Sequence, residues 1–169
     1  MTIIRDCRSG DLEAVQRMNE SALPAVNSLT IDDLAWFLEK ASYFRVADTG
    51  RELVAFLIGL NEGVDYASLN YRWFGERYDA FAYVDRIAVN PTARRQGLAN
   101  RFYADFEDRC AQASGRVVCE VNLRPANDGS MRFHEHQGFV QVGSQETENG
   151  AKEVALMLKD LRSLGMRSL

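Results

Sequence analysis

The stretch Tyr83–Phe106 reads Y-V-D-R-I-A-V-N-P-T-A-R-R-Q-G-L-A-N-R-F-Y-A-D-F and predicts a strand, a basic turn and a helix. The segment up to Val89 is rich in β-branched and aromatic residues, and Asn90-Pro91 stops it because proline has no donor for a strand ladder. Apolar residues then recur at four-residue spacing, as on one face of a helix. They are Leu98, Phe102, Phe106 and Cys110. The sequence therefore predicts that a helix opens near Gln96-Gly97.

The turn before this helix has the features of an anion-binding site. The first turn of a helix presents unpaired N–H groups and the positive end of the helix dipole. Gly97 has no side chain to keep an anion away, and Arg94 and Arg95 add charge. Each charge-assisted hydrogen bond contributes on the order of 1.5–3 kcal/mol, so several hold a pyrophosphate without a metal. A basic turn that only caps a helix is an equal alternative at this point. The lack of Gly-Lys-Ser/Thr and of further glycines disfavours ATP and NAD.

Length and composition predict one domain that spans residues 1–169. A chain of 169 residues with 46% hydrophobic content is long enough to bury a sizeable core. The net charge of −4 argues against nucleic acid or an anionic membrane as the main partner and mildly favours a cationic substrate. No window approaches the ~18 apolar residues of a membrane span, so we expect a soluble, cytoplasmic protein.

The cysteines and histidines do not form a metal-binding pattern. Cys7, Cys110 and Cys119 are widely spaced, and only His134 and His136 add further nitrogen ligands. We therefore predict no metal site and no disulfide framework. Cys110 and Cys119 lie in apolar patterns, which is typical of small buried side chains rather than nucleophiles. His136 is expected to be a solvated helix residue.

Strand and helix patterns alternate along the rest of the chain. A short first strand is followed by a helix that ends before Pro24. A second helix then begins with a capping box formed by Thr30 and Asp33. The predicted strands are Thr2–Cys7, Tyr43–Ala47, Leu53–Leu60, Tyr83–Val89, Arg116–Leu123, Phe139–Gln145 and Glu153–Lys159, and a helix runs from Asn127 to Gly138. This order mixes antiparallel hairpins with a parallel crossover, which predicts an α/β or α+β domain of three layers.

An aromatic segment interrupts the pattern between Asn61 and Asp79. We read it as a long loop, which is uncommon in a compact domain unless it binds a ligand. Its aromatic residues are the predicted acceptor-binding group: Tyr66, Tyr71, Trp73, Phe74 and Tyr78. Aromatic walls hold a cation by cation–π contacts. A dimer contact or a core flap is an equal alternative, because aromatic residues are also enriched there.

Two motifs resemble those of the GNAT superfamily of N-acyltransferases. Arg94-x-x-Gly97-x-Ala99 is similar to the loop that binds the pyrophosphate of acyl-CoA in that family. Asn127-x-x-Ser130-x-x-Phe133-His134-x-x-x-Gly138-Phe139 resembles its second cofactor segment, and the resemblance extends from Thr2 to about Lys159. It implies a mixed, mostly antiparallel sheet of six to seven strands flanked by about four helices, with acetyl-CoA (coenzyme A) as cofactor.

The resemblance also implies which residues contact the cofactor. Ile87, Ala88 and Val89 correspond to the strand backbone that pairs with the pantetheine arm and polarises the thioester carbonyl. Ile87 and Val89 are ordinary core residues in the other reading, and both readings can hold together. The remaining cofactor residues are Arg94, Arg95, Gln96, Gly97, Leu98, Ala99, Asn100, Asn127, Ser130, Phe133 and His134.

The predicted catalytic residues depart from the family pattern at one position. His134 stands where the family commonly has a tyrosine that protonates the leaving thiolate, and its ordinary pKa near ~6.5 leaves only a minority charged at neutral pH. A histidine that merely flanks the cofactor is an equal reading. Asp85, two residues before Ile87 on the same strand face, and Glu120 on the next strand are the candidate bases. A buried salt bridge to Arg86 or Arg116 is the alternative role of these carboxylates.

The resulting prediction is an acetyl-CoA-dependent N-acetyltransferase that acts directly on a primary amine of a small molecule or peptide. Two alternatives remain: a non-catalytic acyl-CoA-binding or regulatory module, which the missing tyrosine suggests, and a GNAT enzyme that uses a longer acyl group. The acceptor amine is not predictable from the sequence, and a homodimer is compatible with the aromatic segment.

Overall fold

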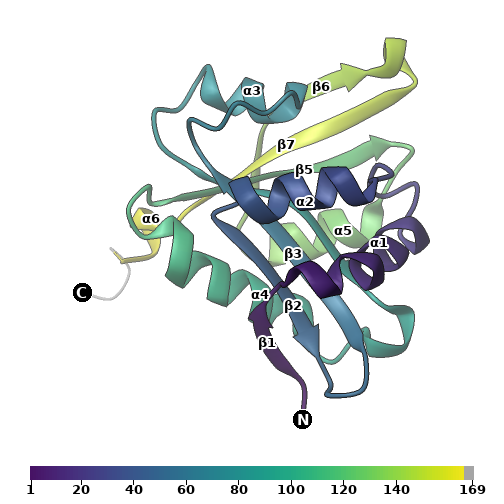
Figure 1. The fold of residues 1–169 in the computed structure, drawn as a ribbon. Coiled ribbons are helices and arrows are strands. Elements are labelled where there is room, and N and C mark those ends of the chain that lie inside the picture. Colours follow the sequence, from purple (N-terminus) through teal and green to yellow (C-terminus); the bar gives the residue numbers. More distant parts are fainter. Residues whose placement is uncertain (166–169) are drawn as a thin grey trace. The chain divides into compact units, whose positions relative to one another are not determined.

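The structure, a computed structural model, describes residues 1–165 and divides the chain into two compact units. The first unit comprises Met1–Leu60 and Val84–Cys110, and the second comprises Asn61–Tyr83 and Ala111–Leu169. Seven strands follow the order β1-β2-β3-β4-β5-β7-β6 (Figure 1). The predicted mixed, mostly antiparallel sheet is therefore confirmed, whereas the single domain stays a prediction. Across residues 1–165, no helix has the length and apolarity to cross a membrane.

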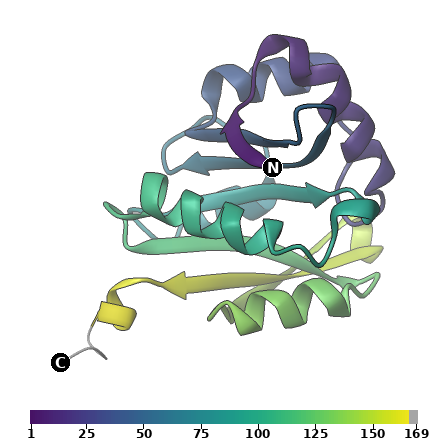
Figure 2. The same ribbon diagram turned by 90° about the horizontal axis from the view of Figure 1, so that it is seen from below.

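The first unit contains an antiparallel meander and three α-helices. Its strands are β1 (Ile3–Asp6), β2 (Tyr43–Asp48), β3 (Leu53–Asn61, shared at its last residue) and the larger part of β4 (Ala82–Val89). Its α-helices are α1 (Leu12–Ser21), α2 (Ile31–Lys40) and α4 (Leu98–Phe106). β1 pairs with β2 and β2 pairs with β3, both antiparallel, and α1 packs beside α2 (Figure 2).

The first two helices begin and end where the sequence predicts. Thr30 accepts a hydrogen bond from the Asp33 N–H at 3.1 Å, and Asp33 accepts one from the Thr30 N–H at 2.8 Å. This is a capping box with aspartate in the third position, and it satisfies two orphan groups of α2. The first helix, α1, ends at Ser21, three residues before Pro24, which confirms the predicted helix boundary.

The helix α4 packs on β2 and β3 through one aromatic ring and one carboxylate. The Phe106 ring lies over Gly59, where an added Cβ would be 2.3 Å from the ring, and it meets Tyr43 edge-on with centroids 5.2 Å apart. Asp105 accepts hydrogen bonds from the Tyr43 hydroxyl at 2.7 Å and from Arg45 at 2.5 Å. Because both contacts lie near the end of α4, they fix the direction in which its first turn points.

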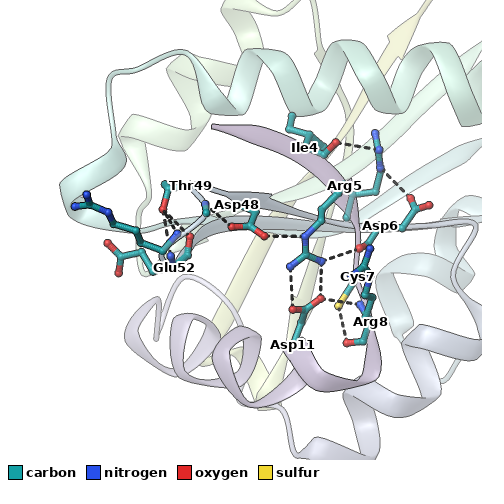
Figure 3. Close-up of polar contacts among 12 residues, drawn as sticks. Ile4, Arg5, Asp6, Cys7, Arg8, Asp11, Asp48, Thr49 and Glu52 are labelled. Atoms are coloured by element: carbon teal, nitrogen blue, oxygen red, sulfur yellow. Dashed lines mark hydrogen bonds and ion pairs between the residues drawn. The ribbon is translucent and has the colours of Figure 1, made fainter. Parts of the chain in front are cut away.

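A polar cluster around Arg5 joins β1, β2 and the start of α1 (Figure 3). The Arg5 guanidinium donates to both Asp11 oxygens, at 2.7 and 3.0 Å, and to Asp48 at 2.8 Å. It holds the pKa of the Asp11 carboxyl below its usual range. A surface hollow of about 600 Å³ borders these residues together with Glu52 and Asn90. Arg5, Asp11 and Asp48 satisfy one another, so the cluster serves the fold.

The second unit contains a short helix followed by the remaining strands. Its elements are α3 (Leu69–Gly75), the start of β4, β5 (Arg116–Arg124), α5 (Asp128–His136), β6 (Val140–Thr147), β7 (Lys152–Asp160) and α6 (Arg162–Gly165). β4 pairs parallel to β5, with Ala82 opposite Val117 and Tyr83 opposite Val118. β5 and β6 both pair antiparallel to β7.

Two local predictions are corrected by the structure. The segment read as a long loop contains α3, whose N-cap Ser68 accepts a hydrogen bond from the Tyr71 N–H at 3.2 Å. The helix predicted to run through Cys110 leaves α geometry after Phe106 and continues as a π-helix, Glu107–Ala111. Cys110 is consequently half-buried rather than buried, whereas Cys119 is 3% exposed as predicted.

The helix α3 is held to β6 by a close contact. The Trp73 ring lies on Gly143, where an added Cβ would be 2.5 Å from the ring. The Gln145 amide donates to Asn70 at 2.8 Å, and the Arg77 guanidinium lies 3.9 Å from the centroid of the Trp73 ring. The aromatic segment is therefore packed structure within the second unit.

Candidate active site

The turn Arg94–Gly97 in the first unit has the geometry of an anion-binding loop. A 3₁₀ turn, Pro91–Ala93, follows β4, and Arg95 and Gly97 then adopt left-handed φ values of 61° and 74°. No side chain caps α4, and its first intrahelical bond runs from the Arg101 N–H to the Gly97 carbonyl at 3.0 Å. The N–H groups of Leu98 and Ala99 precede that bond, so they point out of the helix start.

Two side chains brace this turn from within. Arg94 Nε donates to the Val89 carbonyl at 3.2 Å, and Gln96 Nε2 donates to the Thr92 carbonyl at 3.3 Å. Residues 94–97 are nevertheless exposed, and a Cβ built on Gly97 would meet no atom within 4 Å. The turn is basic and open, and these residues fit the pyrophosphate of a coenzyme A molecule.

The strand that leads into the turn separates buried from half-buried side chains. Arg86 and Ala88 are buried, whereas Ile87 and Val89 are half-buried on the alternate face. The Asn90 N–H donates to the Val54 carbonyl at 2.8 Å, which keeps the end of β4 in register with β3.

Asp85 lies in a buried ion pair with its neighbour. Its carboxylate is 2.7 Å from Arg86 Nε, and the two side chains are 4% and 7% exposed. Arg86 also donates to the Asn19 side chain and to the Asn27 carbonyl, both at 2.9 Å, and so ties β4 to the end of α1 and the following loop. The alternative role predicted for Asp85, a salt bridge to Arg86, is therefore the one that the geometry supports.

Glu120 receives a hydrogen bond that the sequence did not suggest. The buried Tyr83 hydroxyl lies 2.8 and 2.7 Å from the two Glu120 oxygens, and Glu120 itself is half-buried. An O–H donated to a carboxylate stabilises its charged form, which is the form that accepts a proton. Of the two predicted bases, Glu120 therefore has the geometry that suits the role.

His134 is buried in α5 with one ring nitrogen occupied. Its Nδ1 is 2.7 Å from the Ser130 carbonyl, which can only accept, so Nδ1 carries the proton and Nε2 carries the lone pair. The side chain is 5% exposed, and burial lowers the pKa of His134 from its ordinary 6.5. At neutral pH the ring is an uncharged acceptor at Nε2. This arrangement argues against His134 as the acid that protonates a thiolate.

The other residues of the second motif shape the start of α5. Asn127 is its N-cap and accepts a hydrogen bond from the Ser130 N–H at 3.2 Å. Phe133 is half-buried and meets the His134 ring edge-on, with centroids 5.2 Å apart. Gly138 follows the helix with a φ of 94°, which confirms the predicted end of the helix, and His136 is exposed as expected.

The five aromatic residues of the predicted acceptor group divide into two sets. Tyr71 and Phe74 are 4% and 0% exposed, and they belong to the core of the second unit rather than to a binding surface. The other three keep part of their surface exposed: Tyr66, Trp73 and Tyr78. Only these three retain the predicted role.

Tyr83 is the site residue that the sequence analysis missed. Its position at the start of a buried strand is typical of a core aromatic residue, and nothing nearby in the sequence points to Glu120. The register of β4 and β5 was the missing information, because it places Tyr83 opposite Val118, two residues before Glu120.

Comparison with known proteins agrees with this geometry. The family model for the acetyltransferase (GNAT) family matches residues 12–139. No curated protein sequence matches the chain. Three solved structures are similar in fold: Naa20 from Chaetomium thermophilum in complex with a bisubstrate analogue (TM-score 0.77, 18% identity, 98% of this chain and 90% of that chain), Ard1 from Thermoplasma volcanium (0.76, 20%, 95% and 97%) and the ribosomal-protein-S18-alanine N-acetyltransferase from Escherichia coli (0.71, 18%, 95% and 94%).

The family match covers most of the chain, including β4, the basic turn and α5. The structural neighbours share the fold over nearly the whole length of the chain, and the one from Escherichia coli is an N-acetyltransferase by name. The chain therefore belongs to the GNAT family of acetyltransferases and is an enzyme of the N-acetyltransferase type.

Proposed function

We propose that this protein transfers an acetyl group from acetyl-CoA to a primary amine of a small molecule or peptide. The observation that carries the proposal is the exposed turn Arg94–Gly97, where two left-handed residues lead into a helix start without a side-chain cap. An open, basic turn of this kind selects a phosphorylated ligand. Family membership makes acyl-CoA the phosphorylated ligand to test first.

Acetyl-CoA would supply a thioester whose acetyl carbon an amine attacks, with CoA leaving as the thiol. In the first unit, Arg94 and Arg95 and the N–H groups of Leu98 and Ala99 would hold its pyrophosphate. The backbone of Ile87 to Val89 in β4 would bind its pantetheine arm, as the family resemblance implies. The half-buried side chains of Ile87 and Val89 support this role, because their face of the strand is partly exposed.

Glu120 is the proposed base in the second unit. An amine attacks only when it is neutral, so a proton must leave the substrate ammonium. The Glu120 carboxylate is half-buried and held by the Tyr83 hydroxyl, which suits direct acceptance of that proton or acceptance through one water. Asp85, already neutralised by Arg86 at 2.7 Å, is not needed for this step.

The acceptor is proposed to be a cationic primary amine. The chain carries a net charge of −4, and the three partly exposed aromatic residues in and around α3 offer faces for a cation–π contact. They are Tyr66, Trp73 and Tyr78. One of the structurally similar enzymes is named for an alanine of a ribosomal protein as its acceptor, which supports including peptides among the amines to be tested.

Release of free thiol from acetyl-CoA tests the proposal. A panel of amines that includes a polyamine, short peptides with free N-termini and a peptide with an internal lysine would be compared at saturating acetyl-CoA. We expect thiol release that depends on one class of amine, together with an acetylated product 42 Da heavier, since acetyl replaces one hydrogen on nitrogen. The same panel with propionyl-CoA and butyryl-CoA shows whether a longer acyl group is preferred.

A non-catalytic acyl-CoA-binding module is the alternative that one observation favours. His134 replaces the family's usual acid, and its only N–H is donated to the Ser130 carbonyl. The alternative predicts that calorimetry detects CoA binding while no amine in the panel triggers thiol release. The proposed activity needs both binding and amine-dependent release, so one set of measurements separates the two.

A further inference from the structure

The contact between Tyr83 and Glu120 joins two strands at residues 37 positions apart in the chain. In the parallel pair of β4 and β5, Tyr83 is the partner of Val118. Glu120 lies two residues further along β5 and therefore on the same face as Val118. Two residues of strand span roughly 6.6 Å, a distance that a tyrosine side chain bridges when it leans along the strand.

The tyrosine ring is fixed by the aromatic core of the second unit. Tyr71 meets it edge-on with centroids 5.3 Å apart, and Phe74 lies tilted at 6.2 Å. Tyr71 is itself held, because its hydroxyl donates to the Asn61 carbonyl at 2.6 Å and accepts from the Val64 N–H at 3.0 Å. The ring of Tyr83 is fully buried, so its hydroxyl has little freedom to leave Glu120.

This scaffold gives the aromatic segment a second role. Tyr71 and Phe74, which the sequence suggested as acceptor-binding residues, instead pack on the residue that binds the proposed base. The contact also has a defined direction. The phenol O–H donates to the carboxylate, since an ionised carboxylate has acceptors but no donor.

We infer that Tyr83 is a positioning residue for catalysis: its buried hydroxyl keeps Glu120 ionised and oriented to accept the proton of the substrate ammonium. The inference rests on the proposed acetyl transfer with Glu120 as base. In this step the N–H bond of the ammonium breaks, and the proton bonds to a Glu120 oxygen. The amine keeps the electron pair with which it attacks the thioester. Tyr83 keeps its own proton throughout.

The variant Tyr83→Phe removes the hydroxyl and leaves the packed ring in place. Without the donated O–H, the ionised carboxylate is less favoured, so the acid limb of the pH profile of kcat/KM moves upward. We expect a shift of about one pH unit, which corresponds to a roughly ten-fold loss of kcat/KM below the midpoint. At a pH well above the midpoint, kcat/KM returns close to the wild-type value.

Two further variants separate this effect from a loss of structure. Tyr71→Phe removes a hydroxyl from the same aromatic core. That hydroxyl bonds two backbone groups, the Asn61 carbonyl and the Val64 N–H. The variant is expected to lower the melting temperature without moving the midpoint. Glu120→Gln abolishes the acid limb, and the double variant Tyr83→Phe/Glu120→Gln should then match Glu120→Gln, because the hydroxyl no longer has a carboxylate to bind.

The inference is overturned if the wild-type protein releases thiol with an amine and the pH profile of kcat/KM is the same in Tyr83→Phe as in the wild type. A shift of equal size in Tyr71→Phe also overturns it. If the wild-type protein releases no thiol with any amine, the proposed function fails instead. The pair is then tested by the ¹³C chemical shift of the Glu120 carboxyl during a pH titration, whose midpoint should rise in Tyr83→Phe and stay unchanged in Tyr71→Phe.

Discussion

The proposed phosphate-binding turn and the buried polar side chains of this enzyme differ in how they can be recognised. The turn Arg94–Gly97 is exposed, and its donors are backbone groups whose direction is set by two left-handed residues. Asp85, Glu120 and His134 are buried or half-buried, and each is bound to another group of the protein. A site made of backbone can be recognised from residue spacing, whereas the role of a buried side chain depends on its partner.

This difference explains which end of the site follows the family pattern. The turn needs only glycine, arginine and a helix start, so a short motif is enough to recognise it in the sequence. At the chemical end, the same residue type has two different roles: Asp85 neutralises Arg86, and Glu120 accepts a hydrogen bond from Tyr83. Substitutions should therefore affect affinity at the turn, and stability or pH dependence at the buried residues.

The largest effect is expected from Asp85→Asn. The change leaves the Arg86 charge without its carboxylate in a site where both side chains are less than 10% exposed. Breaking such a pair costs about 3–5 kcal/mol of unfolding free energy. Urea denaturation measures the change. Glu39→Gln, which breaks the exposed pair with Lys40, is the control and should leave the unfolding free energy nearly unchanged.

An Asp85→Asn variant with normal stability and no turnover would contradict the structural role. It would instead make Asp85 the base, and the contrast with Glu120 would be lost. Turnover must therefore be measured beside stability, at a temperature where the variant is folded.

The variant Gly97→Glu tests the exposed turn. A carboxylate beside the exposed backbone donors repels the pyrophosphate, and we expect CoA affinity to fall at least 100-fold, roughly 2.7 kcal/mol. Gly97→Gln is the matched control, because it has the same bulk and the same strain at a φ of 74° but no charge. Titration calorimetry of both variants isolates the electrostatic part. Equal affinities for Glu and Gln would remove the turn from the phosphate site.

The variant Arg95→Gly should improve stability and weaken binding together. Arg95 adopts a φ of 61°, a conformation that costs a non-glycine residue about 1–2 kcal/mol. Glycine removes this cost but adds about 0.4–1 kcal/mol of unfolded-state entropy, so the net gain is about 0.5 kcal/mol. Loss of one guanidinium should reduce CoA affinity about ten-fold.

Glu148→Gly provides the comparison for this trade-off. Glu148 has a φ of 53° in the turn between β6 and β7, outside the proposed phosphate site. It should gain stability without any loss of CoA affinity. Unchanged affinity in Arg95→Gly would show that the left-handed arginine is not retained for phosphate binding.

The smallest effect concerns the pH dependence of stability. Burial lowers the pKa of His134 in the folded protein below its unfolded value of about 6.5. The contribution of the neutral His134 ring to the unfolding free energy is complete above that unfolded pKa and is lost as the pH falls through the folded pKa. The loss is about 1.4 kcal/mol for each unit by which the folded pKa lies below the unfolded pKa. Unfolding free energies between pH 7.5 and 5 measure this loss.

His134→Asn should flatten this part of the profile. Asparagine keeps an N–H for the Ser130 carbonyl but does not titrate. His136→Asn, at an exposed position in the same helix, is the matched control for removing a histidine from α5. A profile that stays steep in His134→Asn would mean that another group controls the loss of stability.

Local signals account for the parts of the structure that the sequence predicts. The capping box at Thr30 and Asp33, the stop at Asn90-Pro91 and the glycine start of α4 each act within a few residues, and all are present. The short helix α3 was missed because seven residues capped by Ser68 give too little periodicity. Aromatic content alone does not distinguish a helix that packs from a loop that binds.

Side-chain partnerships across the chain account for what the sequence could not predict. Tyr83 and Glu120 are 37 residues apart, and only the register of β4 and β5 brings them together. Asp85 and Arg86 are neighbours that would normally point to opposite faces of a strand. The long arginine side chain folds back to its neighbour because both groups are buried and each needs a countercharge.

Gly59 and Phe106 together set how closely α4 packs on β3, so neither position can change alone. Any side chain at this position would meet the Phe106 ring, with the nearest carbon 2.3 Å from the new Cβ. Because Phe106 ends the helix that starts at the proposed phosphate-binding turn, any redesign of cofactor preference must treat residues 59 and 106 together. We expect libraries that randomise residue 59 to recover glycine alone, unless residue 106 is allowed to shrink in the same clone.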